Sequence, residues 1–294
     1  MHMNLLRKLT IISAVALMLT SCGGSKKKNS EKGAQKKITI AMVNWSECIA
    51  DTHLAKVALE AHGYKVDLVN ADVAPVFAAV AKGDANVFME VWGPITHKPY
   101  LDKFGDKIEK LGTIYKDGRL GLVVPDYVTI DSINQLNEYK DKFDGKIIGI
   151  NPGAGIMKIT QNVIKDYNLD YELVTSSEAG MLASLKKAYD KKEWVVVTGW
   201  KPHTMFAKWK LKILKDPKKV MGNAESISTY ATKGWAAKNP EAATFFSNFK
   251  MNDDLLGSLM LAVEAAPGKE DQAAQKWYED HKELVDGWFK KQAN

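Results

Sequence analysis

The chain alternates between short apolar runs and longer amphipathic segments. The apolar runs are typical of strands buried in a sheet, whereas the amphipathic segments repeat with the period of a helix. We predict strands at 37–45, 65–71, 85–92, 121–125, 146–150 and 193–200. We predict helices at 50–64, 73–84, 132–143, 155–168 and 178–192, and mainly helical sequence from residue 240 onward, broken at Gly268. Strands separated by such helices favour βαβ units and parallel sheets, and therefore an α/β fold.

The N-terminus has the pattern of an export signal. Arg7 and Lys8 precede an apolar run at 9–19 that is too short to span a bilayer. Leu19-Thr20-Ser21-Cys22 resembles the lipoprotein box of bacteria. The resemblance implies that residues 1–21 are a lipoprotein signal peptide and that Cys22 carries lipid on its thiol. The alternative is a plain signal peptide followed by a chance cysteine.

Residues 22–37 form a lysine-rich segment with almost no apolar side chain, which we expect to be a flexible tether. Residues 1–37 hold eight basic side chains and one acid, so they contribute +7 to a total of +6 and leave the body at −1. The basic excess therefore belongs to the leader and tether, and we expect no nucleic-acid partner. A lysine tether suits an anionic bilayer surface, and equally a plain solubilising linker.

The body, residues 38–294, is long enough for two lobes of ordinary size. Cys22 and Cys48 are the two cysteines of the sequence, so a disulfide framework or a cysteine metal site is excluded. His53, His62 and His281 do not show the spacing of metal ligands. We therefore expect no metal and no cofactor, and we expect Cys48 to be a small buried apolar residue.

Three of the predicted strands end in a tryptophan, at Trp45, Trp92 and Trp200. Ligands of open α/β sheets bind at the carboxyl ends of the strands. One tryptophan at such a place is more often part of the core, but three at one loop-rich edge favour a binding site. The negative face of an indole attracts cations, and a quaternary ammonium is the cation that such a cage suits best. A stacked sugar is the alternative, although the adjoining loops offer few polar side chains for it.

The segment NPGAGIMK, 151–158, follows a predicted strand and opens a helix. The backbone N–H groups of Gly155 and Ile156 would lie at the helix N-terminus, where an anion binds. Beside an aromatic cage, this site predicts a zwitterionic ligand. A dinucleotide fingerprint is not matched, because Lys158 stands where the third glycine is required.

In these motifs the chain resembles the glycine betaine-binding lipoproteins of ABC importers for osmoprotectants. The resemblance covers residues 38 to about 290 and rests on VNWSE, EVWGPITH, NPGAGIM, SSEAGM and TGWKPH. It implies the two-lobe type II periplasmic-binding-protein fold, an α/β fold with a hinge and an interlobe ligand cleft. Lobe 1 would comprise 38–120 plus 224–294 and lobe 2 would comprise 121–223, with hinge candidates at 121–125 and 222–230.

The resemblance also implies roles for single residues. Trp45, Trp92 and Trp200 would form the quaternary-ammonium cage, and Gly155, Ile156 and His97 would bind the carboxylate. The implied protein is a lipid-anchored receptor on the extracytoplasmic face of the cell membrane. It would deliver glycine betaine or a related small molecule to an ABC permease and its ATPase.

Several alternatives stay open at this point. A choline or carnitine receptor belongs to the same class, and a secreted choline-ester hydrolase belongs to another. The sequence contains none of the G-x-S-x-G, H-E-x-x-H and P-loop motifs, and we expect no enzyme. Glu90 would either back the cage or be paired structurally. His203 would either support its loop or, as we favour, have a structural role at the edge of the cleft. Trp235 could be a fourth member of the cage, but we expect it to pack where a helix begins.

Overall fold

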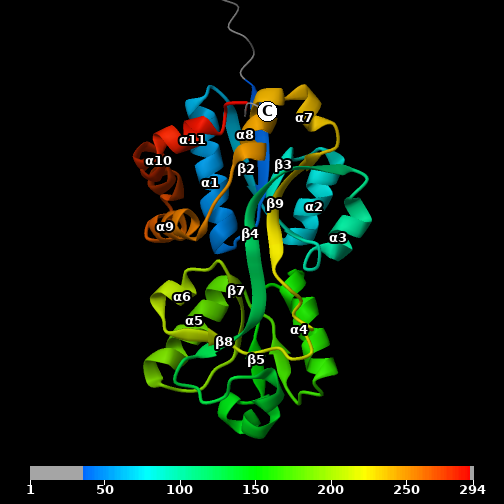
Figure 1. Cartoon of the computed structure of the whole chain (residues 1–294), viewed down its shortest axis with the longest axis vertical. Coiled ribbons are helices and arrows are strands. Elements are labelled where there is room, and N and C mark those ends of the chain that lie inside the picture. Colours follow the sequence, from blue (N-terminus) through cyan, green and yellow to red (C-terminus); the bar gives the residue numbers. More distant parts are fainter. Residues whose placement is uncertain (1–35, 292–294) are drawn as a thin grey trace, which may run out of the picture. The chain divides into compact units, whose positions relative to one another are not determined.

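The computed structural model describes residues 36–291. The predicted signal peptide, nearly all of the tether and Cys22 lie outside the described residues. Between residues 36 and 291, no helix combines the length and the apolar character that crossing a membrane requires. The fold is the predicted α/β fold with two lobes, each built around part of a twisted sheet (Figure 1).

The first part of the sheet contains parallel strands in the order β2 (Lys65–Asn70), β1 (Lys37–Met42) and β3 (Val87–Gly93). β9 (Glu225–Thr232) runs antiparallel to β3, and β4 (Ile108–Pro125) runs antiparallel to β9. The helices of this part are α1 (Ser46–Ala61), α2 (Val73–Lys82), α3 (Lys98–Phe104), α7 (Trp235–Lys238), α8 (Pro240–Asn248), α9 (Asp253–Glu264), α10 (Glu270–Asp280) and α11 (Lys282–Gly287).

The second part of the sheet is built on the last residues of β4, which pair antiparallel with β7 (Val197–Lys201) and β8 (Leu211–Ile213). β7 pairs in parallel with β5 (Lys146–Ile148), and β5 pairs in parallel with β6 (Glu172–Val174). The helices of this part are η1 (Ile133–Phe143), a 3-10 helix kinked at Tyr139, together with α4 (Gly155–Asp166), α5 (Glu178–Lys191) and α6 (Met205–Lys208).

β4 is the strand that the two parts share (Figure 1). Its pairing with β9 ends at Gly118, and its pairing with β7 begins at Arg119. The backbone therefore passes from one group of strands to the other within a single strand. The predicted lobe bounds remain a prediction. The change of partner at Gly118 and Arg119 supports a boundary close to the first hinge candidate, 121–125.

Two apolar clusters fill the lobes. The larger one contains the fully buried aromatic side chains Phe77, Phe88, Phe245, Phe246 and Phe249, together with the strands of the first part of the sheet. The other contains Ile133, Leu136, Ile147, Val163 and Val196 around β5 and η1. The cavity described below is lined by both parts of the sheet, so a ligand there contacts both lobes.

The prediction of parallel sheets was right for β1, β2 and β3 and for β5, β6 and β7, but not for the strands that join these two groups. β4 and β9 run antiparallel to their neighbours, and together they join the two parallel groups. β4 is also far longer than the predicted strand 121–125, and β6, β8, β9 and α3 were not predicted. α1 begins at Ser46, four residues before the predicted start, and Gly268 separates α9 from α10 with a φ of 76° as expected.

Candidate ligand-binding site

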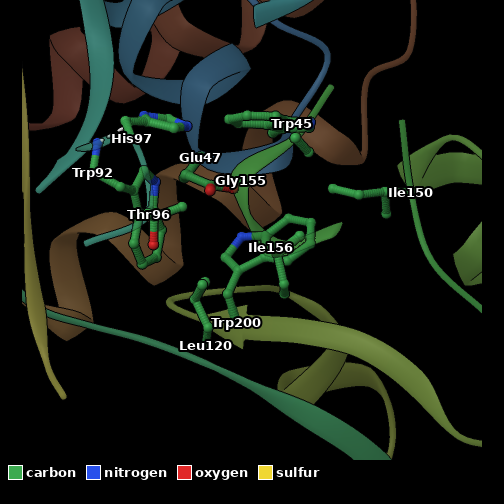
Figure 2. A pocket seen from close by; sticks show the side chains of 11 residues that line it. Trp45, Glu47, Trp92, Thr96, His97, Leu120, Ile150, Gly155, Ile156 and Trp200 are labelled. Atoms are coloured by element: carbon green, nitrogen blue, oxygen red, sulfur yellow. Dashed lines mark hydrogen bonds between the residues drawn. The ribbon is translucent and has the colours of Figure 1, made fainter. Parts of the chain in front are cut away.

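The three predicted tryptophans face one cavity (Figure 2). Trp45 caps the N-terminus of α1, Trp92 lies near the end of β3, and Trp200 lies in β7. All three are buried, with 3–6% of their surface exposed. The residues that complete the lining are Glu47, Thr96, His97, Leu120, Ile150, Ala154, Gly155 and Ile156. The structure thus brings together all six residues predicted for the cage and the carboxylate.

The indole of Trp92 is fixed from two sides. Its Nε1–H donates a hydrogen bond to Oε1 of the fully buried Glu90. Gly118 of β4 lies against the ring, since a Cβ built at this glycine would lie 2.6 Å from Cζ3 of Trp92. A side chain at position 118 would displace the indole. Glu90 is therefore paired with the indole of Trp92, and its role behind a cation cage stays a prediction.

His97 offers a hydrogen-bond donor to the cavity. Its Nδ1 accepts the backbone N–H of Trp92 at 3.0 Å, so in the neutral ring the proton is on Nε2. Burial lowers the pKa of His97 to about 3, which keeps the imidazole neutral. Nε2 is buried, and no acceptor for it lies among residues 36–291. The ring is packed between Trp45, at a centroid distance of 5.9 Å, and Phe77, at 5.5 Å.

The N-terminus of α4 supplies further donors. Met157 N–H closes the first turn onto the carbonyl of Ala154 at 3.0 Å. The N–H groups of Gly155 and Ile156 have no protein acceptor within the described part of the chain. A helix N-terminus attracts negative charge. The lining of the cavity therefore contains indole faces together with three N–H donors, from Gly155, Ile156 and His97.

Gly155 and Thr96 meet where the two lobes approach each other. A Cβ at position 155 would lie 2.6 Å from Cγ2 and 3.0 Å from the carbonyl carbon of Thr96. Glycine therefore permits this approach of α4 to the loop after β3. Glu225 at the start of β9 holds that loop, because its carboxylate accepts the N–H groups of Ile95 and Thr96, the latter at 2.9 Å, and the hydroxyl of Thr96.

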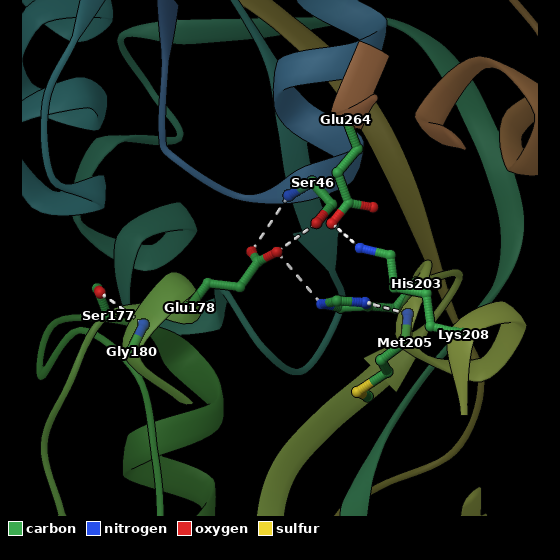
Figure 3. A network of polar contacts seen from close by, with 8 residues as sticks. All are labelled: Ser46, Ser177, Glu178, Gly180, His203, Met205, Lys208 and Glu264. Atoms are coloured by element: carbon green, nitrogen blue, oxygen red, sulfur yellow. Dashed lines mark hydrogen bonds and ion pairs between the residues drawn. The ribbon is translucent and has the colours of Figure 1, made fainter. Parts of the chain in front are cut away.

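A second interlobe contact lies between Ser46, at the start of α1, and Glu178 of α5 (Figure 3). The carboxylate of Glu178, at the start of α5, accepts the backbone N–H of Ser46 at 3.1 Å and also the Ser46 hydroxyl. The same carboxylate lies 3.2 Å from Nε2 of His203, whose ring packs edge-on against Trp200 at 4.7 Å. Lys208 of α6 also pairs with Glu264 of α9. Nδ1 of His203 accepts the backbone N–H of Met205 at 3.0 Å, which holds its own loop, and the contact links Trp200 to the opposite lobe.

The residues predicted to be structural lie away from the cavity. Trp235 begins α7 and packs against Phe246 at 6.1 Å, as expected. Cys48 is fully buried and free. Among the described residues, no cluster of histidine, cysteine or acidic side chains has the arrangement of a metal site. Cys22 lies outside the described residues.

Sequence reasoning missed Glu47, Thr96 and the interlobe role of Glu178. Glu47 and Glu178 each lie within a motif used above, WSE and SSEAGM, so a signal was present. One sequence does not reveal a functional role for these acids, because an acid in the first turn of a helix is favourable there without any ligand.

Comparison with known proteins decides the family. Residues 36–280 match the family described as the substrate binding domain of ABC-type glycine betaine transport systems. The chain belongs to this family. The family consists of substrate-binding domains of ABC transport systems, and the hydrolase alternative is not supported.

Relatives in this family agree. The glycine betaine/carnitine transport binding protein GbuC of Listeria monocytogenes is 46% identical over 145 residues, which is 48% of each chain. The crystal structure of lactococcal OpuAC, closed and complexed with glycine betaine, has a TM-score of 0.82 at 35% identity, covering 87% of this chain and all of that one. ProX from Borrelia burgdorferi has a TM-score of 0.83 at 37% identity, covering 86% and 96%. These structures share the two-lobe fold.

A more distant relative binds a different cation. An ABC-transporter choline-binding protein in complex with choline has a TM-score of 0.79 at 25% identity, covering 86% of this chain and 91% of that one. The alignment with the Listeria protein spans only about half of either chain.

Proposed function

We propose that this protein captures glycine betaine or a closely related quaternary-ammonium zwitterion for import. The observation that carries the proposal is the composition of the cavity lining. Three indoles, of Trp45, Trp92 and Trp200, share one small cavity with three N–H donors that have no protein acceptor within residues 36–291. Trimethylammonium cannot donate a hydrogen bond, so it gains most from indole faces. A carboxylate gains most from convergent N–H groups.

Each half of the ligand would then have its own residues. The methyl groups lie against Trp45, Trp92 and Trp200, while the carboxylate accepts from Gly155, Ile156 and His97. Trp45, Trp92 and His97 belong to the lobe built on the first part of the sheet. Trp200, Gly155 and Ile156 belong to the lobe built on the second part. A ligand that touches both lobes stabilises the closed form, and the closed form is what we expect the permease to recognise. Opening would flex β4 near Gly118, where its partner changes.

The decisive experiment is calorimetric titration of the purified protein with glycine betaine and then with choline. We expect saturable binding of glycine betaine, far tighter than that of choline, because choline has no carboxylate for the N–H donors. Binding of choline alone would retain the cage and remove the proposed roles of Gly155, Ile156 and His97. Heat from neither compound would overturn the proposal.

A choline or carnitine receptor is the second candidate. The choline-bound relative shows that this fold accepts a cation without a carboxylate, and the Listeria relative is named for glycine betaine and carnitine. Carnitine has a longer, hydroxyl-bearing chain between its ammonium and its carboxylate than glycine betaine has. Titration with carnitine in the same series separates this candidate from the first.

We propose that the protein works outside the cytoplasm, anchored by lipid on Cys22, and that it serves osmoprotection together with an ABC permease and its ATPase. The curated relatives of Salmonella typhimurium and Dickeya dadantii are named periplasmic, which supports export. The Cys22→Ala change tests the anchor. We expect the protein to move from the membrane fraction to the soluble exported fraction, while an unchanged distribution would contradict lipidation.

A further inference from the structure

A carboxyl group lies in the aromatic cage. Glu47, in the first turn of α1, is 1% exposed and lines the same cavity as Trp45, Trp92 and Trp200 (Figure 2). Its Oε2 is buried and receives no hydrogen bond from the described residues. A buried carboxyl oxygen without a hydrogen-bond donor is unfavourable. A cation in the cage would remove that penalty, so the position of Glu47 points to a charged ligand.

Two more carboxyl groups stand behind Glu47. Glu90 of β3 and Asp51 of α1 have at most 1% of their surface exposed, and each has one oxygen without a donor within residues 36–291. No lysine or arginine of that part of the chain pairs with any of the three. Like charges buried together cannot all ionise, so this carboxyl cluster of Glu47, Asp51 and Glu90 must retain protons at neutral pH.

Within the carboxyl cluster, Glu47 has the pKa closest to neutral pH. Burial, and next the charge of Glu178 on α5, raise its pKa to about 7, while His203 and the indole N–H of Trp200 on the β7 side lower it. Burial first, and then the charge of Glu47, raise the pKa values of Glu90 and Asp51 well above their usual range. His97, across the cavity, is neutral because burial lowers its pKa to about 3.

We propose that Glu47 is the anionic wall of the ammonium cage and a specificity-determining residue, and that a bound quaternary ammonium displaces its proton to solvent. The inference rests on the function proposed above and adds a charge to a cage otherwise made of indoles. The exchange is balanced, because the protonated protein and the cation give the complex of carboxylate and cation plus one free proton. The residue would reject a ligand of the same shape whose head group carries no charge, which the indoles alone accept by apolar contact.

The first test separates charge from shape. Tert-butylacetate has the shape of glycine betaine, with carbon in place of the positive nitrogen. We expect Glu47→Gln to reduce the ratio of glycine betaine affinity to tert-butylacetate affinity by about tenfold or more, since a buried charge pair contributes at least that much. Glu60→Gln, the same change at an exposed position of α1, serves as the matched control and should leave the ratio unchanged.

A ratio that is the same in wild type and Glu47→Gln would overturn the inference, even where both affinities fall together, because that result indicates a purely structural role. Wild-type protein that binds neither compound would overturn the proposed function and this inference with it. Binding of glycine betaine with an unchanged ratio would leave the proposed function intact and refute the anionic wall alone.

The second test needs no variant, so it stands if Glu47→Gln fails to fold. Titration of the wild type near pH 7 in two buffers of different ionisation enthalpy measures the protons exchanged. We expect release of a fraction of a proton with glycine betaine and also with choline, which has no carboxylate to engage His97. The release should vanish well above pH 7, and affinity should fall below it by up to tenfold per pH unit. Absence of exchange, or uptake of protons, would overturn the inference.

Discussion

Gly155→Ala tests whether binding depends on the close approach of the two lobes. The new methyl group would lie 2.6 Å from Cγ2 and 3.0 Å from the carbonyl carbon of Thr96, where ordinary contact begins at 3.4 Å. The loop of Thr96 is held by Glu225 and cannot simply turn aside. The lobes would therefore have to stop short of the closed arrangement by several tenths of an ångström. Such overpacking costs about 1–3 kcal/mol, which corresponds to roughly a 5- to 150-fold loss of affinity.

The folded state itself should tolerate this alanine. Gly155 is the first residue of α4 and its φ is not positive, so the backbone accepts a Cβ whenever the lobes are apart. We expect an unchanged or slightly higher melting temperature without ligand, together with the loss of affinity measured by calorimetry. Gly257→Ala in α9 is the control, because its Cβ would meet nothing within 4 Å. Wild-type affinity in Gly155→Ala would refute the idea that this contact forms on binding.

Three further predictions concern single side chains. Trp92→Ala should weaken glycine betaine binding by about 2 kcal/mol, measured by calorimetry, whereas Trp194→Ala, outside the cavity, should not. Because His97 has a pKa of about 3 in the folded protein and 6.5 ordinarily, the unfolded chain binds more protons between these values and stability falls as pH drops. When the pH is lowered from about 7 to 5, the free energy of unfolding of His97→Ala should therefore fall by about 2 kcal/mol less than that of the wild type, as measured by denaturant unfolding. Glu178→Gln should raise the ligand dissociation rate severalfold in stopped-flow fluorescence, because the hydrogen bonds to Ser46 lose their charge; an unchanged rate would show that this contact does not hold the lobes closed.

The cage could be predicted from the sequence because its signal is local. Each tryptophan ends an apolar run, and the rule that ligands bind at the carboxyl ends of strands then brings Trp45, Trp92 and Trp200 together without knowledge of their distances. The N–H donors of Gly155 and Ile156 were predictable for the same reason, since a glycine loop opening a helix is a contiguous pattern.

The antiparallel strands could not be predicted in this way. β9 reads ESISTYAT, a central strand built largely of small polar side chains, so it has neither the apolar run nor the strict alternation of a strand signal. The first half of β4 has three irregularities in its register with β9, between Lys110 and Gly118, which break the alternation of its side chains. Periodicity therefore detects only the end of β4, near the predicted 121–125.

Glu47 could not be predicted because its role depends on residues distant in sequence. Glu90, Glu178 and Trp200 surround it only after β3, α5 and β7 have been placed. Taken alone, it is an acid in the first turn of a helix, which is an ordinary and favourable arrangement.

The order of strands in the sheet has a consequence for how the chain folds. β9 lies between β3 and β4, yet it is separated from β3 in sequence by the whole segment that builds the second part of the sheet. The first lobe therefore cannot close its sheet until residues 225–232 are available, and such long-range pairing is slow to form. A chain cut short before β9 would leave the edge of β3 unpaired among buried side chains, and an open edge of that kind invites aggregation. Synthesis through residue 232 is thus a condition for closing the sheet of the first lobe.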